Sequence, residues 1–147
     1  MNIPLELPSL RILVIEDETF MRRLILRVLN ELGIKLIEEA ENGAEGLTQI
    51  NKSAGRLDLI ICDLEMPIMN GLKFIENLRQ GKAGDGTKDI PVIILTGHSD
   101  EDNIQTAVQL GIQGFLVKPI SSAALEKRIK SSVGASVINP ALLSPKR

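Results

Sequence analysis

Five short runs of isoleucine, valine and leucine recur along the chain, each bounded by polar or turn-forming residues. Runs of this length with such boundaries are typical of β-strands. We expect strands at Arg11–Ile15, Lys35–Glu39, Leu57–Cys62, Pro91–Leu95 and Gly114–Val117. The stretches between them place hydrophobic residues at helical spacing, which predicts helices at Thr19–Leu32, Gly43–Asn51, Gly71–Arg79, Glu101–Leu110 and Ser121–Ser132. Strand and helix therefore alternate along the chain.

The first of these helices shows the pattern most clearly. Leu24, Val28 and Leu32 follow one another at spacings of four, while the arginines between them mostly take other faces. Such a stripe predicts an amphipathic helix that turns one face to the core. Thr19 is the expected N-cap, and Gly33 is expected to end the helix.

The alternation of strand and helix predicts the fold class. Strands that are hydrophobic on both faces need helices on both sides, so we expect an α/β fold with a doubly wound, five-stranded parallel sheet. One domain should span residues 10–133, after an N-terminal arm at 1–9 and before a tail or linker at 134–147, where Pro140 and Pro145 break any helical period. The glycine-rich segment Gly81–Asp89 is expected to be a solvated surface insertion.

Composition limits the classes of function. The length of 147 residues suits one domain, and the hydrophobic share of 44% is near the globular average. The net charge of -2, without a cluster of basic residues, argues against direct binding of nucleic acid. The single cysteine, Cys62, cannot form an internal disulfide, and no hydrophobic run is long enough to cross a bilayer. We therefore expect a cytoplasmic protein without a membrane partner.

Polar residues gather where the predicted strands end. Glu16 and Asp17 follow the first strand, Asp63 the third, Thr96 the fourth and Lys118 the fifth. Ligands of parallel α/β sheets bind beyond these carboxyl ends. If the strand order is 2-1-3-4-5, the three acids share one small cleft. Their mutual repulsion would be relieved by a hard divalent cation such as Mg²⁺, and the lysine supplies further positive charge.

Four segments of the chain resemble motifs of the receiver domain of two-component response regulators. They are ILVIEDE at Ile12–Glu18, IICDLEMPIMNG at Ile60–Gly71, VIILTG at Val92–Gly97 and FLVKP at Phe115–Pro119. The match runs from about Leu10 to Ser132 and keeps the order of the family. The resemblance implies a receiver domain at 10–133 with the flavodoxin-like, CheY-like strand order 2-1-3-4-5.

The resemblance also implies how the site acts. Asp63 would accept a phosphoryl group from a phosphohistidine of a histidine kinase or histidine phosphotransfer protein. Thr96 would bind the phosphoryl oxygen after modification, and Lys118 would pair with it. Phe115 matches an aromatic switch position whose rotamer follows Thr96. The peptide bond between Lys118 and Pro119 is expected to be cis.

Further residues would hold the metal and tune the reaction. The resemblance implies that Asp17 binds Mg²⁺ directly, together with Asp63 and the backbone carbonyl of Glu65. Glu16 stands where the family more often has aspartate, and its longer side chain would act through water. Glu65 and His98 overlook the phosphoryl site and would influence how easily water reaches it.

The chemistry of the residues agrees with these roles. An aspartate can be a covalent nucleophile in phosphoryl transfer, and a metal ion with a lysine neutralises the transferring oxygens. The added group carries about -1.5 to -2 charges, enough to attract a hydroxyl and reorder a loop. We expect a signalling switch in a phosphorelay that controls a downstream partner or output domain. Beyond self-catalysed phosphoryl transfer and dephosphorylation, it is not expected to be an enzyme.

The sequence leaves two alternative functions open. A phosphohydrolase with an aspartate nucleophile needs an acid two residues further on, where Glu65 lies, but also a cap segment, for which the chain has no stretch long enough. A pseudo-receiver that serves only as a docking scaffold would not need the intact set of acids. The sequence leaves open the kinase, the stimulus, the downstream effector and whether the protein forms a homodimer.

Overall fold

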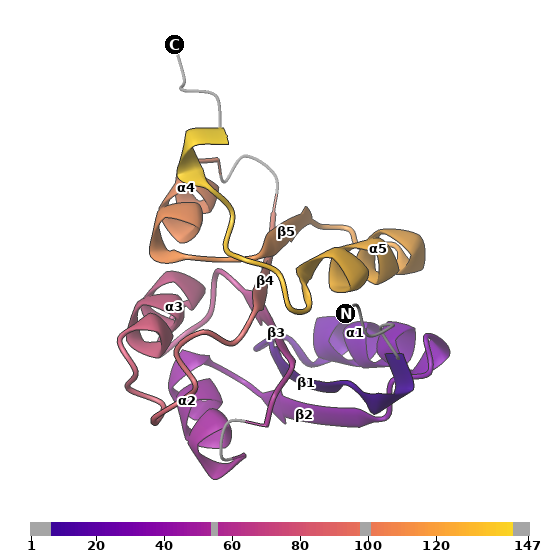
Figure 1. Cartoon of the computed structure of the whole chain (residues 1–147). Helices are drawn as coiled ribbons and strands as arrows, with labels where there is room; N and C mark the ends of the chain where they lie inside the picture. Colours follow the sequence, from indigo (N-terminus) through magenta and orange to yellow (C-terminus); the bar gives the residue numbers. More distant parts are fainter. Residues whose placement is uncertain (1–6, 54–55, 98–100, 143–147) are drawn as a thin grey trace, which may run out of the picture.

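Five parallel strands form one sheet in the computed structural model of the protein (Figure 1). The strands are β1 (Arg11–Ile15), β2 (Leu36–Ala40), β3 (Leu59–Asp63), β4 (Val92–Thr96) and β5 (Gly114–Val117). Their order is β2-β1-β3-β4-β5, and every neighbouring pair is parallel. The structure describes residues 7–53, 56–97 and 101–142. The predicted doubly wound α/β fold is confirmed.

Five α-helices connect and cover these strands within the described residues. They are α1 (Thr19–Glu31), α2 (Gly43–Lys52), α3 (Gly71–Arg79), α4 (Glu101–Leu110) and α5 (Ser122–Ser132), with short 3₁₀ turns η1 (Leu7–Ser9) and η2 (Pro140–Leu142). Helices α1 and α5 pack on one face of the sheet, and α2, α3 and α4 pack on the other (Figure 1). None of the helices in this part of the chain has the length and hydrophobicity that a membrane crossing requires.

The core consists of two hydrophobic layers, one on each face of the sheet. Along β1, Ile12 and Val14 point to the layer of α1 and α5, while Leu13 and Ile15 point to the other. All four are fully buried, and burying each such side chain stabilises the fold by about 1.5–3 kcal/mol. Cys62 lies in the layer of α2, α3 and α4, where burial above all raises the pKa of its thiol well above the ordinary value.

The start of α1 differs from the prediction. Thr19 is not the N-cap, because Glu18 occupies that position with extended backbone and no side-chain capping bond, and Thr19 is already helical. The connection from β1 is short, so the helix begins as soon as the Glu18 carbonyl can accept from the Arg22 N–H, at 2.9 Å. Gly33 follows the end of the helix with a φ of 87°, as expected of a residue that terminates one.

The glycine-rich segment after α3 is attached to the core more firmly than a solvated insertion would be. Ala83 and Thr87 are buried within it. The side chain of Asn51 donates to the carbonyl of Ala83 at 3.2 Å, and the guanidinium of Arg79 donates to the carbonyl of Lys88 at 2.8 Å. The expectation of a solvated insertion is therefore wrong for Ala83 and Thr87. The polar composition of the segment gives no sign that these two residues are buried.

Gly71 allows α3 to pack directly behind the end of β3. A Cβ atom at this position would collide with the carbonyl oxygen of Asp63 and lie 2.9 Å from the Cα atom of Leu64. The N–H of Gly71 donates to the carbonyl of Leu64 at 2.8 Å, which closes the loop between β3 and α3. Because Gly71 has no side chain, α3 can pack against the end of β3 and hold the backbone of Asp63 in place.

We expect Gly71→Ala to lower the free energy of unfolding by about 1–3 kcal/mol, because backbone atoms cannot move aside without strain. Urea unfolding followed by circular dichroism measures this. Gly97→Ala is the matched control, since a Cβ atom there meets nothing within 4 Å among the residues that the structure describes, and its effect should stay within about 0.5 kcal/mol. Equal effects of the two substitutions would contradict the packing argument.

Candidate functional site

Three carboxylates meet at the carboxyl edge of the sheet. Glu16 and Asp17 follow β1 directly, and Asp63 is the last residue of β3. The two strands are hydrogen-bonded neighbours, with Ile15 opposite Cys62. One oxygen atom from each of the three carboxylates lies within 4.8 Å of the others. The fold therefore brings together the three acids that the sequence singled out.

Lys118 reaches this cluster from the far edge of the sheet. It follows β5, where its N–H donates to the carbonyl of Thr96 at 2.8 Å. Its Nζ atom lies 3.1 Å from Oδ2 of Asp63 and 3.3 Å from Oε1 of Glu16. Burial disfavours the charged amine, but the carboxylates of Asp63 and Glu16 outweigh it and raise the pKa of Lys118. The Lys118–Pro119 peptide bond is cis.

Glu16 is completely buried, unlike the half-buried Asp17 beside it. Its Oε2 atom accepts a hydrogen bond from the N–H of Glu18 at 3.2 Å. Burial, followed by the negative charge of Asp63, raises the pKa of Glu16 to about 7. The carboxyl group of Glu16 is therefore partly protonated near neutral pH.

Arg22 supports the loop between β1 and α1, and sequence reasoning missed it. Its guanidinium donates to the carbonyl of Glu16 at 2.7 Å and to the carboxylate of Glu39 at 2.9 Å. These bonds tie the loop to the end of β2. No sequence signal could distinguish Arg22 from Arg23 and Arg27, which lie on the same helix and are exposed.

The two expected switch residues lie on neighbouring strands. Thr96 is the last residue of β4 and is buried, with Oγ1 3.4 Å from the carbonyl oxygen of Gly97. Phe115 lies on β5 opposite Ile94 and is half-buried. Its ring packs against the hydrophobic layer that includes α4. Thr96 is paired with Val117, two residues beyond Phe115 on β5.

A cleft of about 330 Å³ opens above the acids. Glu65, at its rim, is exposed. His98 lies outside the described residues. The cleft is lined by Asp17, Glu18, Asp63, Leu64, Glu65, Gly97 and Lys118.

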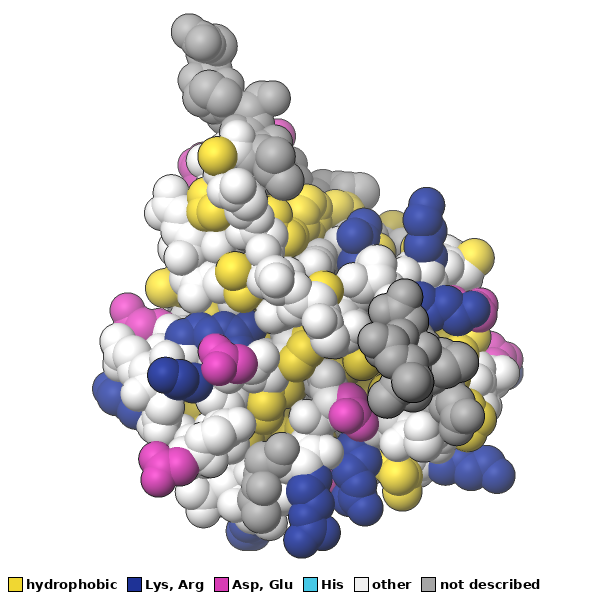
Figure 2. Space-filling model, in the orientation of Figure 1, with side chains coloured by type: hydrophobic (Ala, Val, Ile, Leu, Met, Phe, Trp, Pro, Cys, Tyr) yellow, Lys and Arg dark blue, Asp and Glu magenta, His cyan; other side chains and the backbone are white. Residues whose placement is uncertain are grey.

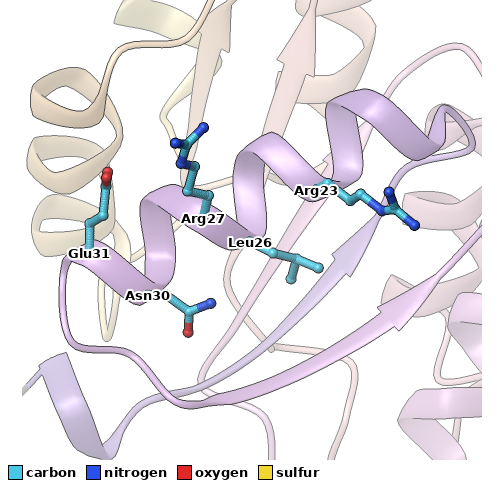
Figure 3. A pocket seen from close by; sticks show the side chains of 5 residues that line it. All are labelled: Arg23, Leu26, Arg27, Asn30 and Glu31. Carbon is cyan, nitrogen blue, oxygen red and sulfur yellow. The ribbon is translucent and has the colours of Figure 1, made fainter.

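A second, shallower depression lies on the outside of α1 (Figure 3). All its lining residues come from that one helix, and none belongs to the acid cluster. They are Arg23, Leu26, Arg27, Asn30 and Glu31. The cleft above the acids differs from this depression because residues that follow several strands meet there.

The acid cluster fits a divalent cation. Three carboxylates and the ammonium group of Lys118 leave two uncompensated negative charges when all are ionised. Carboxylate oxygens are hard ligands of the kind that Mg²⁺ prefers. The residues present therefore suit Mg²⁺ in both charge and ligand type.

Comparisons with known proteins point to one family. Residues 12–130 match the response regulator receiver domain. Chemotaxis protein CheY-3 of Vibrio cholerae is 31% identical over 121 residues, covering 82% of this chain and 89% of that protein. Chemotaxis protein CheY of Pseudomonas aeruginosa is 33% identical over 121 residues, covering 82% and 94%.

Solved structures agree with the sequence matches. The crystal structure of a response regulator receiver domain protein from Clostridium thermocellum superposes with a TM-score of 0.74 at 30% identity, covering 82% of this chain and 91% of that one. Chemotaxis protein CheY4 of Vibrio cholerae gives a TM-score of 0.72 at 29% identity, covering 82% and 96%. The similarity to these solved structures, in both fold and sequence, thus extends over most of the chain.

Without a bound metal, the protein should lose stability as the pH rises from about 5 to 7. The pKa of Glu16 is about 7 in the folded protein against 4.5 ordinarily, so the folded state binds more protons than the unfolded chain in this window. The stability that comes from protonated Glu16 is present below 4.5 and lost as the pH rises through 7. The loss is at most about 3 kcal/mol.

Urea unfolding in the presence of a chelator, repeated across this pH range, measures the effect. Glu16→Gln stays neutral at every pH and should remove most of the slope. The matched control is Glu18→Gln, an exposed neighbour, which should keep it. A Glu16→Gln protein with the slope of the wild type would show that another group is responsible.

Proposed function

The chain belongs to the response regulator receiver domain family, and from this premise we propose that it is a phosphorylation-controlled signalling switch with Asp63 as the phosphoryl acceptor. The donor is a phosphohistidine on a histidine kinase or a histidine phosphotransfer protein. One observation supports this most directly: the carboxylate of Asp63 lies at a strand end, 3.1 Å from the amine of Lys118 and beside two further acids.

The proposed transfer needs only a nucleophile and balanced charge. A carboxylate oxygen of Asp63 attacks phosphorus, and a P–O bond forms while the P–N bond to the donor imidazole breaks. The imidazole leaves with the electron pair of that bond and takes up a proton. Lys118 then pairs with the phosphoryl oxygens.

The same residues provide the place for a metal. Asp17, Asp63 and the backbone carbonyl of Glu65 would hold Mg²⁺, and Glu16 would act through a water molecule. When bound, this ion adds positive charge beside the transferring phosphoryl oxygens. Asp63 is only 7% exposed, so the donor must present its phosphoryl group at the cleft itself.

Thr96 and Phe115 would convert the new charge into a change of shape. The hydroxyl of Thr96 donates to a phosphoryl oxygen in place of present contacts, which include the Gly97 carbonyl. Phe115 on the adjacent strand follows into the space that Thr96 leaves. The surface around β5 then presents a different face to a downstream effector in the cytoplasm.

Hydrolysis returns the switch to its first state. Water attacks phosphorus, the P–O bond to Asp63 breaks, and inorganic phosphate leaves the regenerated carboxylate. Glu65, exposed at the rim of the cleft, would govern the approach of this water together with His98. Transfer and hydrolysis are the only reactions in the proposal, and the chain catalyses both on itself.

Asp63→Asn should abolish phosphorylation, because the nearly isosteric amide is not a nucleophile. The wild type, incubated with Mg²⁺ and a small phosphodonor, should gain the mass of one phosphoryl group, and Asp63→Asn none. Asp85→Asn, at an exposed aspartate, is the matched control and should still be modified.

Stoichiometric modification of the Asp63→Asn protein would overturn the assignment. A wild type that gains no mass would favour a docking scaffold. Rapid turnover of unrelated phosphate esters would favour a phosphohydrolase.

Asp17→Asn should weaken Mg²⁺ binding about tenfold or more, since it removes a direct carboxylate ligand. Glu16→Gln should weaken it less, because Glu16 acts through water and, with a pKa of about 7, is already partly neutral. Calorimetric titration of both variants with Mg²⁺ measures the difference. Equal losses would count against the distinction between the two acids.

A further inference from the structure

The chain after α5 returns to the opposite side of the domain and lies against α4. We call residues 135–142 the C-terminal segment. Figure 1 shows it as the yellow ribbon that runs from α5 across the sheet to η2 beside α4. In the space-filling view, hydrophobic side chains gather over α4 and this segment (Figure 2). Ile138 of the segment packs against the hydrophobic layer that contains Ala107 and Val108 of α4.

A few contacts hold the segment at the amino ends of β4 and β5. The N–H of Ile138 donates to the carbonyl of Ile112 at 2.8 Å. The side-chain amide of Gln113 donates to the carbonyl of Ala135 at 3.5 Å. The side chain of Ile138 packs against the same hydrophobic layer as α4. Ser136 and Val137 are exposed, whereas Ile138 is half-buried, so the attachment depends strongly on Ile138.

The short connection between α4 and β5 is held by side-chain hydrogen bonds from α3. Gly111 follows α4 directly and ends the helix with a φ of 111°, a backbone conformation that favours glycine. The guanidinium of Arg79 donates to the carbonyl of Gly111 at 2.9 Å and to Oε1 of Gln113 at 3.2 Å. Arg79 thereby fixes the residues after the helix to α3, on which α4 itself also packs.

The C-terminal segment contacts both this connection and α4. It is bonded to Ile112 and Gln113, just before β5, and η2 contacts α4. Ala107 and Val108 of α4 are buried in the layer that both Ile138 and the proposed switch residue Phe115 contact. A movement of α4 that follows Thr96 and Phe115 would therefore change the packing around Ile138.

We infer that the C-terminal segment restrains α4 in its unphosphorylated position and is released when Asp63 is phosphorylated, an inference that rests on the proposed function. Linkage makes the effect reciprocal: a change that detaches the segment favours the phosphorylated arrangement by the same factor as phosphorylation favours detachment. The segment is thus an internal restraint that sets how readily the switch turns.

Binding of beryllium fluoride, which imitates a phosphoryl group on aspartate, tests the inference in the full chain with Mg²⁺. Ile138→Asp should detach the segment and bind beryllium fluoride about fivefold more tightly than the wild type. Ser136→Asp adds the same charge at an exposed neighbour and should leave the affinity unchanged. In the wild type, the Ile138 amide should exchange its hydrogen faster once beryllium fluoride is bound, and the amide of Ile12 in β1 should not.

Equal affinities of wild type and Ile138→Asp, with unchanged exchange at Ile138, would overturn the inference and leave the proposed function intact. A wild type that fails to bind beryllium fluoride would instead contradict the proposed function. Thermal unfolding shows whether Ile138→Asp is folded. If it is not, exchange at Ile138 in the wild type decides alone.

Discussion

The ion pairs of Lys118 with Asp63 and Glu16 are the interaction on which the site depends. Three carboxylates within 4.8 Å of one another repel strongly, and the Nζ atom lies 3.1 and 3.3 Å from two of them. The fold brings the amine of Lys118 to these carboxylates. The strand order places β1 and β3 side by side, while the cleft at their ends is close enough for a lysine that follows the edge strand β5 to reach across. Gly71 and Arg22 then hold the loops that carry the acids.

The single positive charge of Lys118 does not balance the negative charges of three acids. This excess of negative charge makes the site sensitive to protons and cations. In the absence of a metal, a proton on Glu16 reduces the negative charge of the site, since burial and Asp63 raise the pKa of Glu16 to about 7. A proton on Glu16 and a divalent cation in the cleft therefore compete for the same excess of negative charge, so binding of the cation should release protons. In the proposed mechanism, phosphorylation would add further negative charge at the same place, and the hydroxyl of Thr96 would turn toward it. The proposed switch would thus follow from the excess of negative charge at this site.

Much of the fold and of the site could be predicted because both depend on patterns local in sequence. Buried strands need runs such as Ile12–Ile15, and the acids and the lysine stand directly at strand ends. The features that escaped prediction involve backbone partners remote in sequence. Arg79 donates to carbonyls at Gly111 and Ile90, which any residue type would offer. Ile68, with a φ of 68°, adopts a conformation that its β-branched side chain disfavours, and Ile138 lies beside Val137 in a segment without periodicity.

A crystal structure of the full chain with Mg²⁺ and beryllium fluoride tests the central claim most directly. The account predicts Mg²⁺ at about 2.0–2.1 Å from oxygens of Asp17, Asp63 and the Glu65 backbone carbonyl. Beryllium fluoride should be bonded to Asp63, with Lys118 and Thr96 contacting its fluorine atoms. A metal ion bound away from these acids, or beryllium fluoride on another side chain, would contradict the account.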